Sequence, residues 1–196
     1  MKHYLISCTI ILICFTMSCK NDSNKSEAKI KSLATESVTK LAKQKLELKD
    51  TEPVSQEKFH DWFPEQLAGM KLESIQEDQL RKQDISGAEA VYKSDGAKKL
   101  TVSVMDAAGK KGVNLLSMYS TVKYQKFIDT ENTSIQLIED KKRLGTETYN
   151  KVLNETKINV LYKNRFSVIM NGTDMNTKET HKAFNSLKLD KLFSAD

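Results

Sequence analysis

The chain has 196 residues, with 31 Lys and Arg against 26 Asp and Glu and a formal charge of +5 at pH 7. From Glu52 onward 22 basic residues face 21 acidic ones, so the positive excess lies in the N-terminal quarter. This balance excludes a typical nucleic-acid-binding domain, because phosphate contacts need a concentrated basic face. The length beyond that quarter is that of one domain with one core.

The first 19 residues have the pattern of a secretion signal that ends at a cysteine. An apolar run from Leu5 to Met17 is about 13 residues long, which matches a signal core, whereas a lasting membrane span needs roughly 20. The three cysteines of the chain are Cys8, Cys14 and Cys19. The sequence after them therefore offers no thiol for a disulfide, a nucleophile or a thiolate metal site.

Ser18 followed by Cys19 resembles the bacterial lipoprotein signal, in which a small residue precedes a cysteine that is diacylglycerated and becomes the mature N-terminus. The two residues before Ser18 depart from the preferred ones, as in the looser signals of Bacteroidetes. The resemblance implies a signal peptide over residues 1–18, lipidation at Cys19 and attachment to the membrane. Lys20, in place of the Asp of inner-membrane lipoproteins, favours the outer membrane, on either its periplasmic or its surface face. The alternative is an ordinary signal peptide cut nearby, which leaves a free thiol.

Residues 19–52 are expected to tether the lipid to the domain. From Ser26 to Lys49 apolar residues recur at roughly helical spacing, which predicts a marginal helix or a fraying tether. They are Ile30, Leu33, Val38, Leu41 and Leu46. Thr51-Glu52-Pro53 interrupts this pattern, so we place a single monomeric domain at residues 53–196.

Alternating apolar residues predict seven strands after the tether. They cover residues 70–75, 88–93, 100–106, 134–139, 145–152, 157–162 and 166–170. Before the first strand stand three large aromatic residues, Phe59, Trp62 and Phe63. We expect them to cover one end of a sheet, with ligand stacking as the alternative.

Two stretches change to helical spacing. The first opens after Gly112 and carries a stripe of Leu115, Met118, Tyr119 and Val122. The second begins at Asn176, where Glu179 three residues later completes a capping box, and its stripe is Thr180, Ala183, Phe184 and Leu187.

This order of elements predicts an α+β domain with a single antiparallel β-sheet flanked by helices. Over most of residues 59–192 the order resembles the PsbP-like fold of many small envelope lipoproteins, although no diagnostic motif accompanies it. The resemblance implies an α/β/α layered arrangement and a binding or assembly role, while fold alone does not decide function.

The best candidate for a ligand site is the loop from residue 106 to 112. It comprises Asp106, Gly109, Lys110, Lys111 and Gly112, and it joins a predicted strand to a helix start, where free backbone N–H groups favour anions. It is not a phosphate-binding loop of the Walker type, because Val113 follows Gly112 where that motif needs Lys. The alternative is a flexible connector with solvated lysines.

His60 and His181 lie in no metal-ligand spacing and beside no nucleophile motif. We therefore expect no catalytic residue, no metal and no cofactor. The sequence favours a non-catalytic binding or assembly module with an envelope protein as its partner and no nucleic acid. The alternatives are an envelope hydrolase or small-ligand carrier that uses the 106–112 loop, and an immunity lipoprotein that neutralises a rival's toxin.

Overall fold

The computed structural model describes residues 39–77, 84–125 and 127–193. The predictions for the signal peptide, for Cys19 and for the first part of the tether concern residues outside these ranges. Residues from Ser37 onward form one compact unit, which begins before the boundary expected at Pro53.

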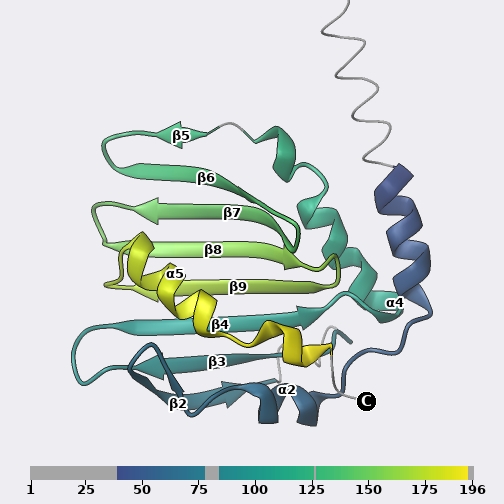
Figure 1. The fold of residues 1–196 in the computed structure, drawn as a ribbon, viewed down its shortest axis with the longest axis horizontal. Coiled ribbons are helices and arrows are strands. Elements are labelled where there is room, and N and C mark those ends of the chain that lie inside the picture. Colours follow the sequence, from purple (N-terminus) through teal and green to yellow (C-terminus); the bar gives the residue numbers. More distant parts are fainter. Residues whose placement is uncertain (1–38, 78–83, 126, 194–196) are drawn as a thin grey trace, which may run out of the picture. The chain divides into compact units, whose positions relative to one another are not determined.

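Nine strands form one antiparallel sheet in the described part of the chain (Figure 1). They are β1 (Gln66–Leu67), β2 (Met70–Gln76), β3 (Gly87–Lys93), β4 (Lys99–Asp106), β5 (Ile128–Asp129), β6 (Thr133–Glu139), β7 (Arg143–Asn150), β8 (Glu155–Tyr162) and β9 (Phe166–Thr173). Their order is β1-β2-β3-β4-β9-β8-β7-β6-β5, so two meanders meet where β4 pairs with β9. The predicted α+β class with a single antiparallel sheet is confirmed.

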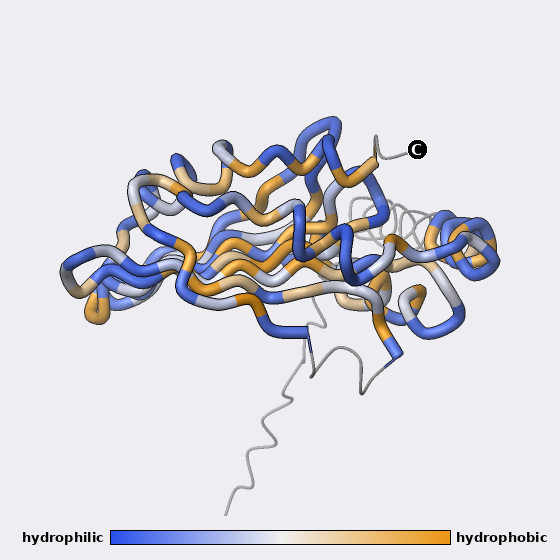
Figure 2. The backbone as a smooth tube through the Cα atoms, turned by 90° about the horizontal axis from the view of Figure 1, so that it is seen from below, coloured by the Kyte–Doolittle hydropathy of each residue, from blue (hydrophilic) through white to orange (hydrophobic). Residues whose placement is uncertain are grey.

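The register at this junction explains the two faces of the sheet. Val102 of β4 pairs with Met170 of β9, and both side chains are fully buried. Because side chains alternate along a strand, the next pair, Ser103 and Ile169, faces the opposite side. Figure 2 shows hydrophobic positions gathered along the strands and mostly hydrophilic ones in the turns.

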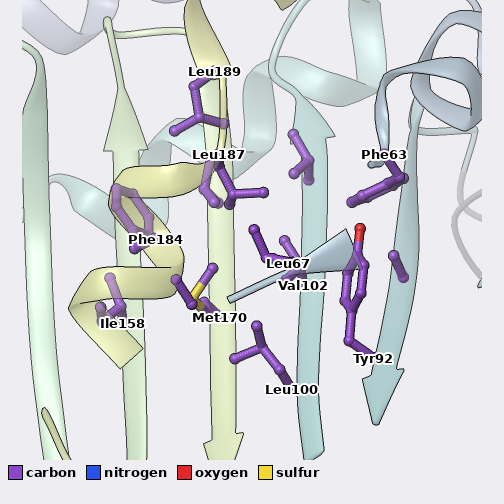
Figure 3. Packing of buried hydrophobic residues seen from close by; sticks show 14 of the residues in the cluster. Phe63, Leu67, Tyr92, Leu100, Val102, Ile158, Met170, Phe184, Leu187 and Leu189 are labelled. Atoms are coloured by element: carbon purple, nitrogen blue, oxygen red, sulfur yellow. The ribbon is translucent and has the colours of Figure 1, made fainter. Parts of the chain in front are cut away.

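One face of the sheet is covered by the helices α2 (Gln56–Trp62) and α5 (Thr177–Ser186) and the 3-10 helix η3 (Leu189–Leu192). Figure 3 shows Phe184 of α5 near Ile158 of β8, with Met170 beside them. The predicted capping box is confirmed, because Glu179 N–H donates to the Asn176 side chain at 3.0 Å and Asn176 N–H donates to the Glu179 carboxylate at 3.1 Å. Phe59 and Phe63 are buried here, as expected for aromatics that cover the sheet.

The connection between β4 and β5 covers part of the other face. It consists of α4 (Gly109–Gly112) and the 3-10 helices η1 (Val113–Tyr119) and η2 (Val122–Tyr124). Leu116, Tyr119 and Val122 are buried, and their spacing of three residues fits the three residues per turn of a 3-10 helix. The expected α-helical stripe was therefore wrong at Met118, whose side chain is 50% exposed.

A helix over residues 39–49 belongs to the compact unit. Leu41 and Leu48 pack against the hydrophobic cluster around η1, and Lys45 Nζ donates to Ser117 Oγ at 2.7 Å. Tertiary packing of this kind stabilises a short helix that is marginal by itself. The second half of the expected tether is thus helical and packed on the sheet domain.

Strand ends differ most from the prediction. β7 stops at Asn150, whose side-chain oxygen accepts the N–H groups of Val152 and Leu153 at 3.1 Å and so turns the chain. Val152 is 71% exposed in that turn. The two-residue strands β1 and β5 are too short to give a periodic signal. None of the described helices is long and apolar enough to cross a bilayer.

Candidate functional site

The carboxylate of Asp106, the first residue of the predicted loop site, is fully buried at the end of β4. Arg165 donates to it twice, from Nε to Oδ1 at 2.9 Å and from Nη2 to Oδ2 at 2.8 Å. The N–H groups of Val54 and Ala108 donate to the same carboxylate, each at 2.9 Å. A buried charge requires such partners. Asp106 is therefore an anchor of the fold whose acceptor capacity the chain itself fills.

The two glycines of the loop allow close packing. A Cβ on Gly109 would lie 2.9 Å from Pro53 Cγ, and a Cβ on Gly112 would lie 2.6 Å from the carbonyl oxygen of Asp106. Gly109 also has a φ of +80°, a conformation that glycine adopts without strain. The Pro53 ring therefore packs against Gly109 and backbone packs against Gly112, which leaves little room for a ligand at either position.

Lys110 and Lys111 lie in α4 and are exposed. Their helix has only four residues, and its N-cap, Ala108, makes no side-chain capping bond. The structure thus brings the five predicted residues together on one short loop, which acts as a packed junction between β4, η1 and residues 52–54.

An open groove of about 490 Å³ lies elsewhere, between the turn that joins β6 to β7 and the segment formed by α5 and η3. This volume falls in the range of roughly 300–1,000 Å³ that is typical of small-molecule sites. Its lining residues are Asp140, Lys142, Arg143, Tyr162, Phe184, Asn185, Leu187, Lys188, Leu189, Asp190 and Lys191. Sequence reasoning did not identify this groove.

The floor of the groove is apolar. Phe184, Leu187 and Leu189 line it and are at least nine-tenths buried. Figure 3 shows the three side chains following one another along the segment that crosses the sheet. They give the groove a hydrophobic base supported by the main core.

Asp190 organises one wall of the groove. Its carboxylate receives Lys142 Nζ at 2.8 Å, Lys163 Nζ at 2.5 Å and the Tyr162 hydroxyl at 2.8 Å. The hydrogen bond from Lys142 has the largest effect on the Asp190 pKa, followed by those from Lys163 and Tyr162. Together they hold this pKa well below its usual range. The hydrogen bond to Asp190 also raises the pKa of Lys142. This wall therefore stays charged at neutral pH.

Arg143, the first residue of β7, also lines the groove. Its Nε donates to Asp140 Oδ2 at 2.7 Å, and its guanidinium carbon lies 5.7 Å from the centre of the Phe184 ring. Burial alone would raise the pKa of Asp140, but hydrogen bonds from the Lys142 N–H and from Arg143 lower it. Among the described residues only Nε of this guanidinium donates a hydrogen bond, so its two terminal nitrogens keep their donor capacity.

The groove combines charged walls with an apolar floor, an arrangement suited to binding a ligand. Four cations and two carboxylates line it, which gives a positive balance, and its lining includes no Ser, Thr, Cys or His. The lining therefore lacks the Ser–His and Cys–His pairs that form many nucleophilic sites. An anion joined to an apolar group would match both the walls and the floor.

The two histidines in the described part of the chain, His60 and His181, lie outside the groove lining. His181 Nε2 on α5 is 2.5 Å from Oε2 of Glu147, a buried carboxylate on β7, although the contact does not meet hydrogen-bond geometry. His60 lies on α2, where it is exposed beside Asp61. Within the described ranges no group of three or more His, Cys, Asp and Glu could hold a metal ion.

Comparisons of the chain with protein-family models, with curated proteins and with solved structures return no match.

Proposed function

We propose that the chain is a cell-envelope lipoprotein, anchored in the outer membrane through a lipid on Cys19, whose domain is a non-catalytic binding module. The binding surface is the groove between the β6–β7 turn and the α5–η3 segment. The observation that carries this proposal is the combination of an apolar floor with charged walls in a lining that contains no Ser, Thr, Cys or His. The antiparallel sheet with helices on both faces supports the PsbP-like resemblance, a fold mostly used for binding or assembly.

The alternative site at the 106–112 loop has weaker support. Asp106 is saturated by four donors, and the glycines are packed against backbone or Pro53. Only Lys110 and Lys111 are exposed there, and exposed lysines on a connector need no functional explanation. A hydrolase or carrier that uses this loop would lack a free carboxylate.

The test combines fractionation with a pull-down from solubilised membranes. Cys19→Ala should move the protein from the membrane pellet to the soluble fraction, because acyl chains would supply nearly all of its membrane affinity. A variant that stays in the pellet contradicts the lipid anchor.

The pull-down then compares charge-reversing variants of the lipidated protein. Lys188→Glu, in the groove, should lose the captured ligand or partner, whereas Lys182→Glu, exposed on the same α5–η3 segment outside the groove lining, should keep it. The double variant Lys110→Ala/Lys111→Ala should also keep it. Loss in the double variant with retention in Lys188→Glu would move the site to the loop.

A further inference from the structure

The guanidinium of Arg143 is held in an orientation that suits anion binding. One edge is fixed by the bond to Asp140, and one face lies over the Phe184 ring. The arginine side chain is 27% exposed, so it is partly shielded from water. A planar guanidinium fixed in this way presents its remaining N–H groups as a fork that matches a carboxylate or a phosphate. Its orientation needs little further ordering when a ligand binds.

Lys188 supplies a second cation at the groove. Its carbonyl oxygen accepts the Trp62 indole N–H at 3.1 Å, which fixes the backbone just before η3. Within the described residues its amino group makes no ion pair, whereas Lys142 and Lys163 are already bound to Asp190. Arg143 and Lys188 are therefore two cations of the groove with capacity for an outside anion.

The floor indicates that the ligand has an apolar part as well. A groove of about 490 Å³ exceeds what a lone oxyanion fills, and Phe184, Leu187 and Leu189 form its base. An apolar group laid on this base would leave water, which favours binding.

We infer that the groove binds an amphiphilic anion, in which a phosphate or carboxylate is held by Arg143 and Lys188 and an aliphatic or aromatic group rests on Phe184 and Leu189. This inference rests on the proposed function, because it names the ligand class of the same groove. Lipid-derived molecules and soluble metabolites can both carry this chemistry.

The experiment uses the unlipidated Cys19→Ala protein, which retains the rest of the mature chain, and titrates it calorimetrically with four probes. Hexyl phosphate and hexanoate carry both parts of the ligand, inorganic phosphate carries the anion alone, and hexanol carries the apolar chain alone. We expect at least one of the first two to bind about tenfold more tightly than either single-part probe. The better of the two then identifies the phosphate or the carboxylate.

Three variants locate the binding. Arg143→Lys keeps the charge and the possibility of pairing with Asp140 but loses the fork, so it should weaken the better probe about tenfold. Lys188→Ala should weaken it as well, and this exposed position tests the proposal if Arg143→Lys unfolds. Lys182→Ala, exposed on α5, is the matched control and should bind like the parent protein.

Equal binding by the parent protein, Arg143→Lys and Lys188→Ala would overturn the inference, as would hexanol binding as tightly as hexyl phosphate. The result is distinguishable from failure of the proposed function. If no probe binds but the membrane pull-down still depends on Lys188, the proposed binding function is supported and the amphiphilic-anion ligand class is wrong. If the probes bind but the pull-down is independent of the groove, the ligand class stands and the partner-binding surface lies elsewhere.

Discussion

The junction around Asp106 and the groove wall around Asp190 use the same chemistry in opposite surroundings. Asp106 is fully buried and receives a bidentate pair from Arg165 and two backbone N–H groups. Asp190 receives two lysines and a tyrosine, but its side chain is 54% exposed. Similar numbers of donors thus serve two purposes. The buried cluster holds three segments of chain together, and the exposed one sets the charge of a surface.

Solvent explains why the purposes differ. A buried carboxylate that loses its cation cannot be rehydrated, whereas an exposed one exchanges its partner for water at small cost. The comparison predicts that disrupting the buried cluster lowers the stability of the fold much more than disrupting the exposed one.

The largest effect is expected for Arg165→Met. This variant leaves Asp106 buried with only its backbone donors, and it should lower the free energy of unfolding by about 3 kcal/mol, near the low end for a buried pair because Arg165 keeps some contact with water. Urea denaturation followed by circular dichroism measures the change. Lys142→Met, which removes one exposed partner of Asp190, is the control, and an equal loss in both variants would contradict the comparison.

An intermediate effect is expected for Gly112→Ala at the same junction. Its Cβ would lie 2.6 Å from the carbonyl oxygen of Asp106, so the backbone must shift, at a cost of about 1–3 kcal/mol. Gly96→Ala is the matched control, because the nearest neighbour of its Cβ would be Ser94 Oγ at 3.8 Å, an ordinary van der Waals contact. Thermal melting of the two variants should separate them clearly. Similar melting temperatures would show that the junction yields more easily than its packing indicates.

The smallest effect is expected for Asp190→Asn, and it should depend on pH. The folded pKa of Asp190 is lowered, so its contribution to stability is present above the unfolded pKa of about 3.9 and is lost as the pH falls through the folded value. The difference in melting temperature between parent and variant should therefore shrink when the pH is lowered from neutrality to about pH 2. A difference that stays constant over this range would mean that the lysines do not stabilise the charged carboxylate.

Sequence patterns were most informative where structure is local. Alternation located the central strands, and the spacing of Asn176 and Glu179 located the start of α5. The pattern after Gly112 indicated a helix but not its 3-10 geometry, since the same apolar residues serve either form over a few turns.

The functional interpretation depended on partners that lie far apart in the chain. Residues 106–112 have the composition of a ligand site when this segment is considered alone. Arg165, 59 positions away, pairs with Asp106 and gives that carboxylate a structural role. The groove likewise requires the β6–β7 turn to meet η3, as when Lys142 reaches Asp190 across 48 positions. The hydrophobic periodicity within one element carries no information about contacts between elements that are distant in sequence.

The pairing of β4 with β9 also determines when the sheet can form completely during folding. The first meander ends in a strand whose outer hydrogen-bonding edge is filled by the last strand of the second meander. Contacts so distant in sequence form late and slow the folding of a chain. While β9 is missing, β4 presents an open edge to other chains. A truncation that removes β9 should therefore cause aggregation of the first meander, and rapid folding depends on having the C-terminal third of the chain present from the start.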